Sequence, residues 1–253
     1  MQEVPVRQLE TIQWQQRDPL SDGTGRIARH YFFKRVFDIT FTLCALILLL
    51  PLMLIFALFI RLDSPGPAIF KQERVGAKRQ LRNGRTVWVI HTFAFYKFRT
   101  MRTDIDANLH QQYMEAYISG DESKMSELQP DTKSAKSYKL SGDPRITRIG
   151  KLLRRLSLDE LPQLWNIIKG DMSLVGPRPP IPYEVEKYQH RHLRRLAALP
   201  GLTGLWQVSG RCETTFEEMV QLDLEYIAKQ SIWLDLKILL KTVPAVISAK
   251  GAG

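Results

Sequence analysis

The longest apolar run in the sequence extends from Ile39 to Ile60 and contains no charged residue. As a helix with a rise of ~1.5 Å per residue, it would be roughly 33 Å long, enough to cross a bilayer core of about 30 Å. A buried core helix is the alternative interpretation, but uncharged runs of this length are typical of membrane segments. The pattern therefore predicts a membrane helix.

Two features of this run bear on its topology. Pro51 lies within it, where proline removes a backbone hydrogen bond and favours a kink. Basic residues flank the run on both sides: Arg26, Arg29, Lys34 and Arg35 precede it, and Arg61, Lys71, Arg74, Lys78 and Arg79 follow it. Because positive charge normally marks the cytoplasmic side, this symmetry suits a bent helix that enters and leaves the same leaflet. A single span also fits, and the residues alone leave that choice open.

The pattern changes to that of strands over residues 66–100. Two segments there, AIFKQERVG and VWVIHTFAFYKFRTM, are rich in β-branched and aromatic residues, and turn-like Asn83-Gly84 lies between them. We therefore expect short strands in this region. Residues 104–140 are polar with few apolar anchors, which predicts helix or loop.

Helical spacing dominates from about Ile146 onward. Thr215 to Glu218 reads T-F-E-E, the pattern of a capping box, before the helical segment MVQLDLEYIAKQ. A final helix is predicted from about Ile232 to Val246, with an apolar face suited to packing or to a membrane interface. Pro244 is expected to kink or end that helix.

Polar residues broken by prolines and glycines make up residues 1–30, which predicts a flexible arm without a cleavable signal peptide. The expected organisation is this arm, a membrane helix at 31–62, and one domain at 63–253. With 44% hydrophobic residues in 253, the chain can form a sizeable core.

The composition limits the classes of binding partner but does not identify one. A formal net charge of +10 favours an anionic partner, which leaves nucleic acid, acidic lipid headgroups and phosphorylated substrates open. The two cysteines, Cys44 and Cys212, are too few and too far apart for a disulfide framework or a metal knuckle. The five histidines lack metal-ligand spacing, so the sequence does not predict a zinc site.

The segment KLLRRLSLDELPQLWNIIKGDMSLVGPRP, residues 151–179, contains adjacent carboxylates, Asp159 and Glu160. Ser157 and Glu160 have the spacing of a capping box, which would place both acids in the first turn of a helix that ends at Gly170. If the helix began at Ser157, Pro162 would lie inside it, where proline is unfavourable. A helix that begins nearer Pro162 is therefore the alternative. In both versions the acids lie at a helix N-terminus.

Such acids can be purely structural, because a carboxylate in a first turn stabilises the helix dipole by about 0.3–1 kcal/mol. The residues around the two acids favour a catalytic or metal-binding role instead. Arg154 and Arg155 lie just upstream, and Arg178 stands within Pro177-Arg178-Pro179. Carboxylates bind Mg²⁺ and arginine forks match phosphate oxygens, so the cluster predicts a site for Mg²⁺ and phosphate. A carboxylate can also act as a covalent nucleophile at phosphorus.

Motifs in a specific order extend this hypothesis. They are KRVFD at 34–38, FKQERVG at 70–76, YKFRTM at 96–101, DPRITRIGKLLRRLSLDELPQLWNIIKGDMSLVGPRP at 143–179, PGLTGLWQVSGR at 200–211 and LDLEYI at 222–227. On this set, covering roughly residues 31–250, the chain resembles the bacterial sugar transferase family, the monotopic polyprenyl-phosphate sugar-1-phosphate transferases.

The resemblance implies an α+β, mostly helical monotopic membrane protein with a small β-hairpin region and amphipathic interfacial helices. Its re-entrant membrane helix would be broken at Pro51, although Leu50 stands where many members have serine. Residues 63–253 would form the catalytic domain on the cytoplasmic face of the bacterial inner membrane. Lys34 and Arg35, with Asp38 nearby, would lie at the level of the lipid headgroups.

The resemblance also implies a reaction. Asp159 would attack the β-phosphorus of a UDP-sugar, release UMP and pass the sugar phosphate to undecaprenyl phosphate, a first membrane step in polysaccharide or glycoconjugate synthesis. Glu160 would help to bind Mg²⁺, with Asp159 as the other carboxylate at the metal. Residues matched to phosphate or substrate contacts are Arg154 and Arg178, and further candidates are Lys97, Arg99, Arg74 and Arg145.

Three other classes compete with this interpretation. A membrane-anchored interaction protein would explain the apolar run and the charge but not the ordered motifs. A nucleic-acid-binding module has no zinc-finger spacing or RNA-recognition aromatic motif to support it, so no nucleic acid is expected as a partner. The polytopic transferases of the same reaction need many spans, whereas this chain has one long apolar segment. The sugar, the pathway and a homodimeric state stay open.

Overall fold

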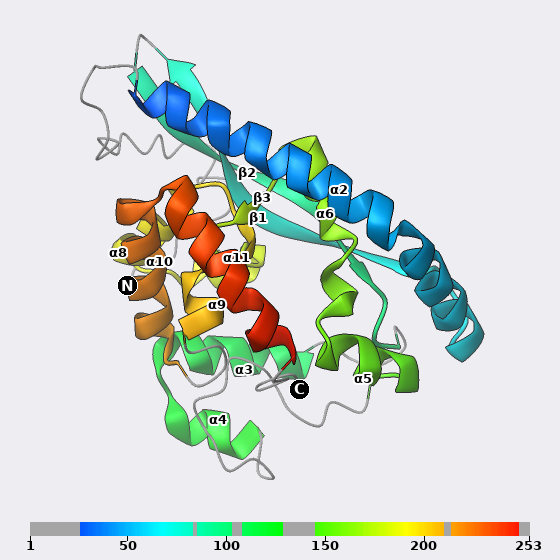
Figure 1. Ribbon diagram of the computed structural model, residues 1–253. Helices are drawn as coiled ribbons and strands as arrows, with labels where there is room; N and C mark the ends of the chain where they lie inside the picture. Colours follow the sequence, from blue (N-terminus) through cyan, green and yellow to red (C-terminus); the bar gives the residue numbers. More distant parts are fainter. Residues whose placement is uncertain (1–25, 83–84, 103–107, 129–144, 210–213, 248–253) are drawn as a thin grey trace.

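The computed structural model describes residues 26–82, 85–102, 108–128, 145–209 and 214–247, and in these the chain is mostly helical with two small sheets (Figure 1). The helices are α2 (Arg26–Asp63), α3 (Asn108–Ser119), α4 (Glu122–Leu128), α5 (Arg148–Arg155), α6 (Gln163–Lys169), α7 (Pro182–Glu186), α8 (His190–Leu193), α9 (Leu205–Ser209), α10 (Phe216–Lys229) and α11 (Ile232–Ile247), with 3-10 turns η1 (Leu158–Glu160) and η2 (Arg194–Leu196). The strands are β1 (Ile69–Arg82), β2 (Arg85–Phe98), β3 (Ser173–Val175) and β4 (Gly201–Thr203). The predicted α+β class with a helical majority is confirmed. Most of the predicted N-terminal arm lies outside the described residues.

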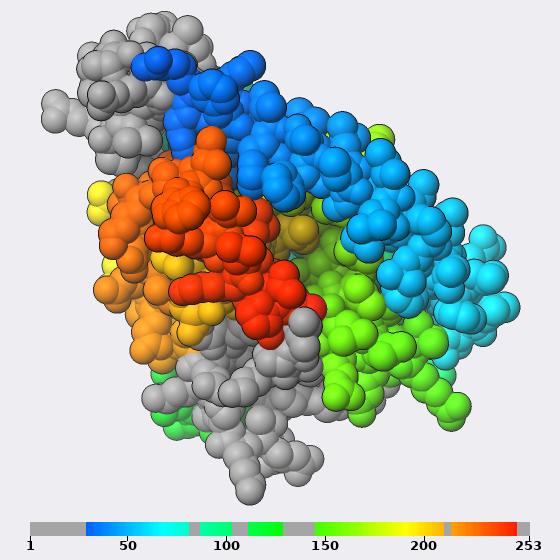
Figure 2. All heavy atoms as spheres, viewed as in Figure 1, coloured from blue at the N-terminus to red at the C-terminus, as the bar shows by residue number. Residues whose placement is uncertain are grey.

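The apolar run forms α2, which lies along one edge of the molecule (Figures 1 and 2). Many of its large apolar side chains are exposed, and Ile47 and Leu48 are each 78% exposed. Within the described part of the chain, α2 is the one helix long and apolar enough to cross a membrane. The helix continues through Pro51 rather than breaking there. An apolar surface of this extent is unfavourable in water and suits lipid.

Strands β1 and β2 form a long antiparallel hairpin beside α2 (Figure 1). Their register pairs Ile69 with Phe98 and Arg82 with Arg85, so each strand has 14 residues, longer than the short strands predicted. Phe93 and Phe95 alternate along β2 and are both buried, as expected of a strand with one face on the core. The predicted Asn83-Gly84 turn lies outside the described residues.

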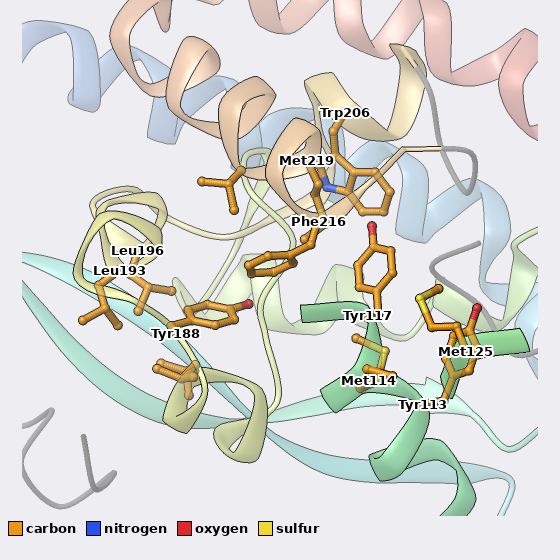
Figure 3. Packing of buried hydrophobic residues seen from close by; sticks show 14 of the residues in the cluster. Tyr113, Met114, Tyr117, Met125, Tyr188, Leu193, Leu196, Trp206, Phe216 and Met219 are labelled. Atoms are coloured by element: carbon orange, nitrogen blue, oxygen red, sulfur yellow. The ribbon is translucent and has the colours of Figure 1, made fainter. Parts of the chain in front are cut away.

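The apolar core consists mainly of two clusters. In the first, aromatic and methionine side chains of α3, α9 and α10 pack together, including Tyr117, Trp206 and Phe216 (Figure 3). The second joins β2 to α6, α10 and α11. Ile167 of α6 and Ile238 of α11 are almost fully buried in it. This second cluster fixes α6 against the hairpin and thereby positions the turn that precedes α6.

Local signals in the sequence correctly predicted several helix ends. The Thr215 hydroxyl accepts a hydrogen bond from the Glu218 backbone N–H at 3.3 Å, and the Glu218 carboxylate accepts one from the Thr215 N–H at 2.8 Å, which is the predicted capping box. Gly170 ends α6 with a φ of 81°, a left-handed conformation that glycine adopts without strain. The final helix was also predicted within one residue of its observed end.

Candidate active site

Asp159 and Glu160 lie in the short turn η1, immediately before α6. Ser157 does not form the predicted capping box: its backbone is left-handed, with a φ of 54°, and its side chain makes no capping hydrogen bond. The alternative start near Pro162 is correct, because α6 begins at Gln163. The left-handed residue reverses the chain after α5, so that the two acids sit in a turn between two helices.

Cations from two distant segments meet this turn. Lys97 Nζ of β2 lies 3.0 Å from Glu160 Oε1 and 3.5 Å from Asp159 Oδ2. The Arg178 guanidinium, from the Pro177-Arg178-Pro179 loop, donates to Glu160 Oε1 at 3.2 Å. Asp159 is only 8% exposed. The structure thus brings four of the predicted site residues together: both acids, Lys97 and Arg178.

A buried asparagine that the sequence analysis missed holds α6 against β2. The Asn166 side chain donates to the Ala94 carbonyl at 2.6 Å and accepts from the Tyr96 N–H at 3.2 Å. It therefore satisfies backbone groups of β2 in the way that a neighbouring strand would. Because Lys97 follows Tyr96 directly, this contact fixes the backbone from which the Lys97 side chain reaches the turn. Nothing in the local sequence marks Asn166 as different from a surface residue of α6.

Backbone contacts fix the loop that presents Arg178. The Gly176 N–H donates to the Thr203 carbonyl at 2.9 Å, and the Gly201 N–H donates to the Pro177 carbonyl at 2.8 Å, extending the parallel pairing of β3 with β4. A Cβ at Gly176 would overlap the Leu199 carbonyl, so this close approach requires glycine. The short parallel sheet was not predicted.

Arg74 also supports the loop that carries Arg178. It is 6% exposed, its guanidinium donates to the Pro179 carbonyl at 3.0 Å, and Gln72 accepts two further hydrogen bonds from it. The next residue, Val75, donates its N–H to the Pro180 carbonyl at 2.9 Å. These contacts make Arg74 a support of the Arg178 loop, whereas the sequence suggested a substrate contact.

The other predicted arginines are placed differently. Arg99 is 5% exposed and donates to the carbonyls of Ser64 and Pro65 at 2.6 and 2.7 Å, so it holds the backbone that directly follows α2. Arg154 lies half-buried in the last turn of α5, and its carbonyl accepts from the Ser157 N–H at the start of the η1 turn. Arg145 is 9% exposed, and its carbonyl accepts from the Arg102 N–H.

The residues expected at the lipid headgroups hold α2 to the rest of the protein. Lys34 is 4% exposed and pairs with Asp235 of α11 at 2.5 Å, with Asp38 at 4.0 Å. The Arg35 guanidinium donates to the carbonyls of Ile167 and Ile168 at 2.6 and 2.9 Å, in the last turn of α6. Both cations therefore have partners inside the protein, and a contact of either one with lipid phosphates stays a prediction.

The two acids fit Mg²⁺ only as part of a larger ligand set. Among the described residues, no group of three or more His, Cys, Asp or Glu could hold a metal ion by protein ligands alone. Mg²⁺ is commonly held by one or two carboxylates together with substrate phosphates and water. Asp159 and Glu160 can supply that share, so the residues fit a metal that arrives with, or is completed by, a phosphorylated ligand.

The geometry defines a class of protein: a mostly helical domain with a long apolar helix and a paired-carboxylate site bordered by cations, suited to phosphorylated ligands. Comparison with known proteins makes the class specific. The sequence pattern described as bacterial sugar transferase matches residues 29–249, which is most of the chain. The chain belongs to the bacterial sugar transferase family.

Its relatives are proteins of sugar transfer and polysaccharide production. The chain is 44% identical over 224 residues to the galactosyl transferase CpsE of Streptococcus agalactiae, covering 88% of this chain and 44% of that protein. It is 40% identical to the undecaprenyl-phosphate galactose phosphotransferase of Salmonella typhimurium, covering 87% and 42%. It is 38% identical to the exopolysaccharide production protein ExoY of Sinorhizobium fredii, covering 87% of both. The chain thus spans less than half the length of the first two relatives.

Proposed function

We propose that this chain transfers a sugar-1-phosphate from a UDP-sugar to undecaprenyl phosphate, with Asp159 as the covalent nucleophile. The observation that carries the proposal is the convergence of Lys97 and Arg178 on the Asp159–Glu160 pair. Phosphoryl transfer depends on positioning and on stabilising the charge of the transferring group, which this arrangement supplies. The printed names of relatives such as the undecaprenyl-phosphate galactose phosphotransferase support the choice of donor and acceptor.

The reaction would proceed in two displacements. In the first, an Asp159 carboxylate oxygen attacks the β-phosphorus of the donor, the bond from that phosphorus to the bridging oxygen breaks, and UMP leaves with the electron pair. In the second, a phosphate oxygen of the polyprenyl phosphate attacks the same phosphorus. The bond to Asp159 then breaks, and the free carboxylate and a polyprenyl-diphospho-sugar are formed. Both steps use one carboxylate in one place, which suits a residue fixed in a buried turn.

The neighbouring side chains would orient the reactants. Lys97, which contacts both acids, would hold the carboxylates in their turn and attract the oxygens of a phosphate bound beside them. Arg178 supplies a planar fork that matches phosphate oxygens. Glu160, with Asp159, would hold Mg²⁺, which when bound neutralises charge on the donor phosphates. Because Glu160 already contacts both cations, it also sets their distance from the nucleophile.

Exposed apolar surface supports a site at the membrane. Besides α2, the amphipathic helices α5 and α11 present large apolar side chains to the outside: Leu152 is 49% exposed, and Trp233 and Leu240 are each 65% exposed. These helices lie at the surface in Figure 2, and α5 leads directly into the turn with the two acids. A membrane at this surface would bring a lipid phosphate close to Asp159, on the cytoplasmic face of the inner membrane where UDP-sugars are soluble.

The reaction is tested by UMP release from purified protein in nanodiscs with Mg²⁺, undecaprenyl phosphate and a panel of UDP-sugars that includes UDP-galactose and UDP-glucose. We expect release with at least one donor and at least a thousandfold slower release in Asp159→Asn. Exposed Glu225→Gln serves as the control and should keep the wild-type rate. Release that persists in Asp159→Asn would exclude Asp159 as the nucleophile, and no release with any donor would contradict the proposed reaction.

We further propose that α2 is re-entrant, with both ends on the cytoplasmic side. The basic residues at both ends support this topology. The helix is continuous through Pro51, so re-entry would require it to bend there, where proline favours a kink. Single cysteines at Phe32 and Leu62, which are 64% and 73% exposed, can be labelled from either side after both native cysteines are replaced by serine. We expect the two sites to react from the same side. Reaction from opposite sides would establish a simple span.

A further inference from the structure

Glu184 is a buried acid that the reaction described above does not use. It lies in α7, the short helix that follows the Pro177–Pro180 loop, and it is 3% exposed. One carboxylate oxygen, Oε2, accepts a hydrogen bond from the Ile181 N–H at 3.2 Å. The other, Oε1, is buried and has no hydrogen-bond partner among the described residues. A helix cap alone does not require such burial, because capping acids ordinarily face water.

The charges around Glu184 are arginines. Burial raises the pKa of this carboxyl, and Arg74, Arg195 and Arg178 oppose that shift by electrostatic attraction. Two of them have other anchors: Arg195 is paired with Asp223, and Arg74 holds the Pro179 carbonyl. Arg178 is the one of the three that borders the Asp159–Glu160 pair. Glu184 thus lies near both Arg74, which supports the loop, and Arg178, the cation at the candidate site.

A small cavity of about 10 Å³ connects the two side chains. Glu184 and Arg178 both line it, with Tyr188 and Arg195, and the Arg178 Nε atom is buried. A volume of this size holds about one water molecule, so the carboxylate can act on the guanidinium through a bridging water as well as by direct attraction.

We propose, on the basis of the proposed function, that Glu184 is the positioning residue for Arg178. Arg178 donates to Glu160, yet in the transfer Glu160 must share its oxygens with a metal and Arg178 must reach phosphate. The contact between Arg178 and Glu160 would therefore weaken at that moment. Glu184 is a second anion that does not take part in the chemistry, and it keeps the guanidinium in place while Glu160 changes partners.

The substitution Glu184→Gln isolates the charge, because the amide is isosteric and its oxygen can still accept from the Ile181 N–H. Glu186→Gln, on the same helix, is the matched control. We expect Glu184→Gln to lower the rate of transfer about tenfold and the affinity for UDP about fivefold, with Glu186→Gln within twofold of wild type. In an Arg178→Ala background the same Glu184→Gln change should alter UDP affinity less than twofold, since residues that act through one another are not additive. An undiminished effect in that background would refute the proposal.

A readout independent of activity separates this proposal from the reaction. In protein labelled with ¹⁵N-arginine, the Arg178 Nε–H signal is assigned from its loss in Arg178→Lys. We expect its exchange with water to be at least tenfold faster in Glu184→Gln and close to wild type in Glu184→Asp, which keeps the charge. Unchanged exchange in Glu184→Gln, or equal acceleration in both variants, would overturn the proposal. If the wild type transfers no sugar, the proposed function fails, and this exchange measurement still decides the role of Glu184.

Discussion

The buried ion pair between Arg195 and Asp223 gives a quantitative prediction about stability. Arg195, in η2, donates to Asp223 Oδ2 of α10 from Nε at 2.9 Å and from a terminal nitrogen at 2.5 Å, and the two side chains are 3% and 1% exposed. A third bond runs from Arg195 to the Tyr188 hydroxyl at 2.8 Å. Asp223→Ala leaves the guanidinium buried without its carboxylate. We therefore expect a loss of about 3–5 kcal/mol in the free energy of unfolding.

The pH dependence of the same group has a defined sign. Burial raises the pKa of Asp223 to about 6, an effect that Arg195 opposes, whereas an unfolded chain titrates this group at about 3.9. The folded state therefore binds the proton more tightly, and the stability that this group contributes at low pH is lost as pH rises through about 6. Between pH 7 and pH 5 the free energy of unfolding of the wild type should rise by roughly 1 kcal/mol relative to Asp223→Asn, given these two pKa values.

Thermal unfolding in nanodiscs measures both effects. At about 2–4 °C per kcal/mol for a chain of this size, Asp223→Ala should lower Tm by roughly 6–20 °C at pH 7. Glu225→Ala is the control on the same helix, because Glu225 pairs with Lys229 at the surface, and it should change stability by at most about 1 kcal/mol. A Tm for Asp223→Ala within 2 °C of this control, or a difference from Asp223→Asn that does not grow toward pH 5, would refute the reasoning.

Three further predictions concern other parts of the fold. Arg99→Met removes the donors to the carbonyls at the C-terminal end of α2 and should lower stability by roughly 3 kcal/mol, whereas an unchanged Tm would show that the clamp is dispensable. Gly176→Ala brings a Cβ into the Leu199 carbonyl and should lower stability by about 3 kcal/mol, measured by the same unfolding assay; a shift below about 1 kcal/mol would mean that the two strands can separate freely. Burial lowers the pKa of His192, an effect that Glu217 opposes, so its contribution is present above about pH 6.5 and lost as pH falls through the lower folded pKa. The acid-induced fall in Tm should therefore shrink in His192→Gln, and an identical pH profile would contradict this.

Much of the fold could be predicted because its signals are local. The Ile39–Ile60 run shows its environment through composition alone, and the Thr215 capping box and Gly170 stop are made by residues close in sequence. The parallel pairing of β3 with β4 could not be predicted in this way. Its strands have three residues each and are brought together by the close approach of Gly176 to Gly201, a contact between distant segments that no periodicity marks.

In the candidate site, too, residues marked by local sequence signals could be predicted, and residues defined by contacts between distant segments could not. Asp159, Glu160 and Arg178 could be proposed from the sequence because charged residues cluster within one segment, and Lys97 because its motif accompanies that segment in the family. Asn166 and Glu184 were missed, since a polar residue reveals a buried role only when its partners, such as the Ala94 carbonyl, are known.

The protein partners of Lys34 and Arg35 could not be predicted for a related reason. A basic residue beside an apolar run suits a lipid phosphate as well as a protein acceptor, and only the fold shows that Asp235 and the end of α6 are the acceptors. The sequence could therefore indicate that positive charge is needed at the start of α2 but not which group it binds.

The most direct test of the central claim is a search for the covalent intermediate on Asp159. Protein in nanodiscs would be incubated with Mg²⁺ and the active UDP-sugar carrying a labelled β-phosphate, without acceptor lipid, and its peptides analysed by mass spectrometry. The account predicts a sugar-phosphate adduct on Asp159 that disappears when undecaprenyl phosphate is added, absent in Asp159→Asn and retained in the exposed control Asp121→Asn. An active enzyme that never carries label on Asp159, or that carries it on another residue, would contradict the account.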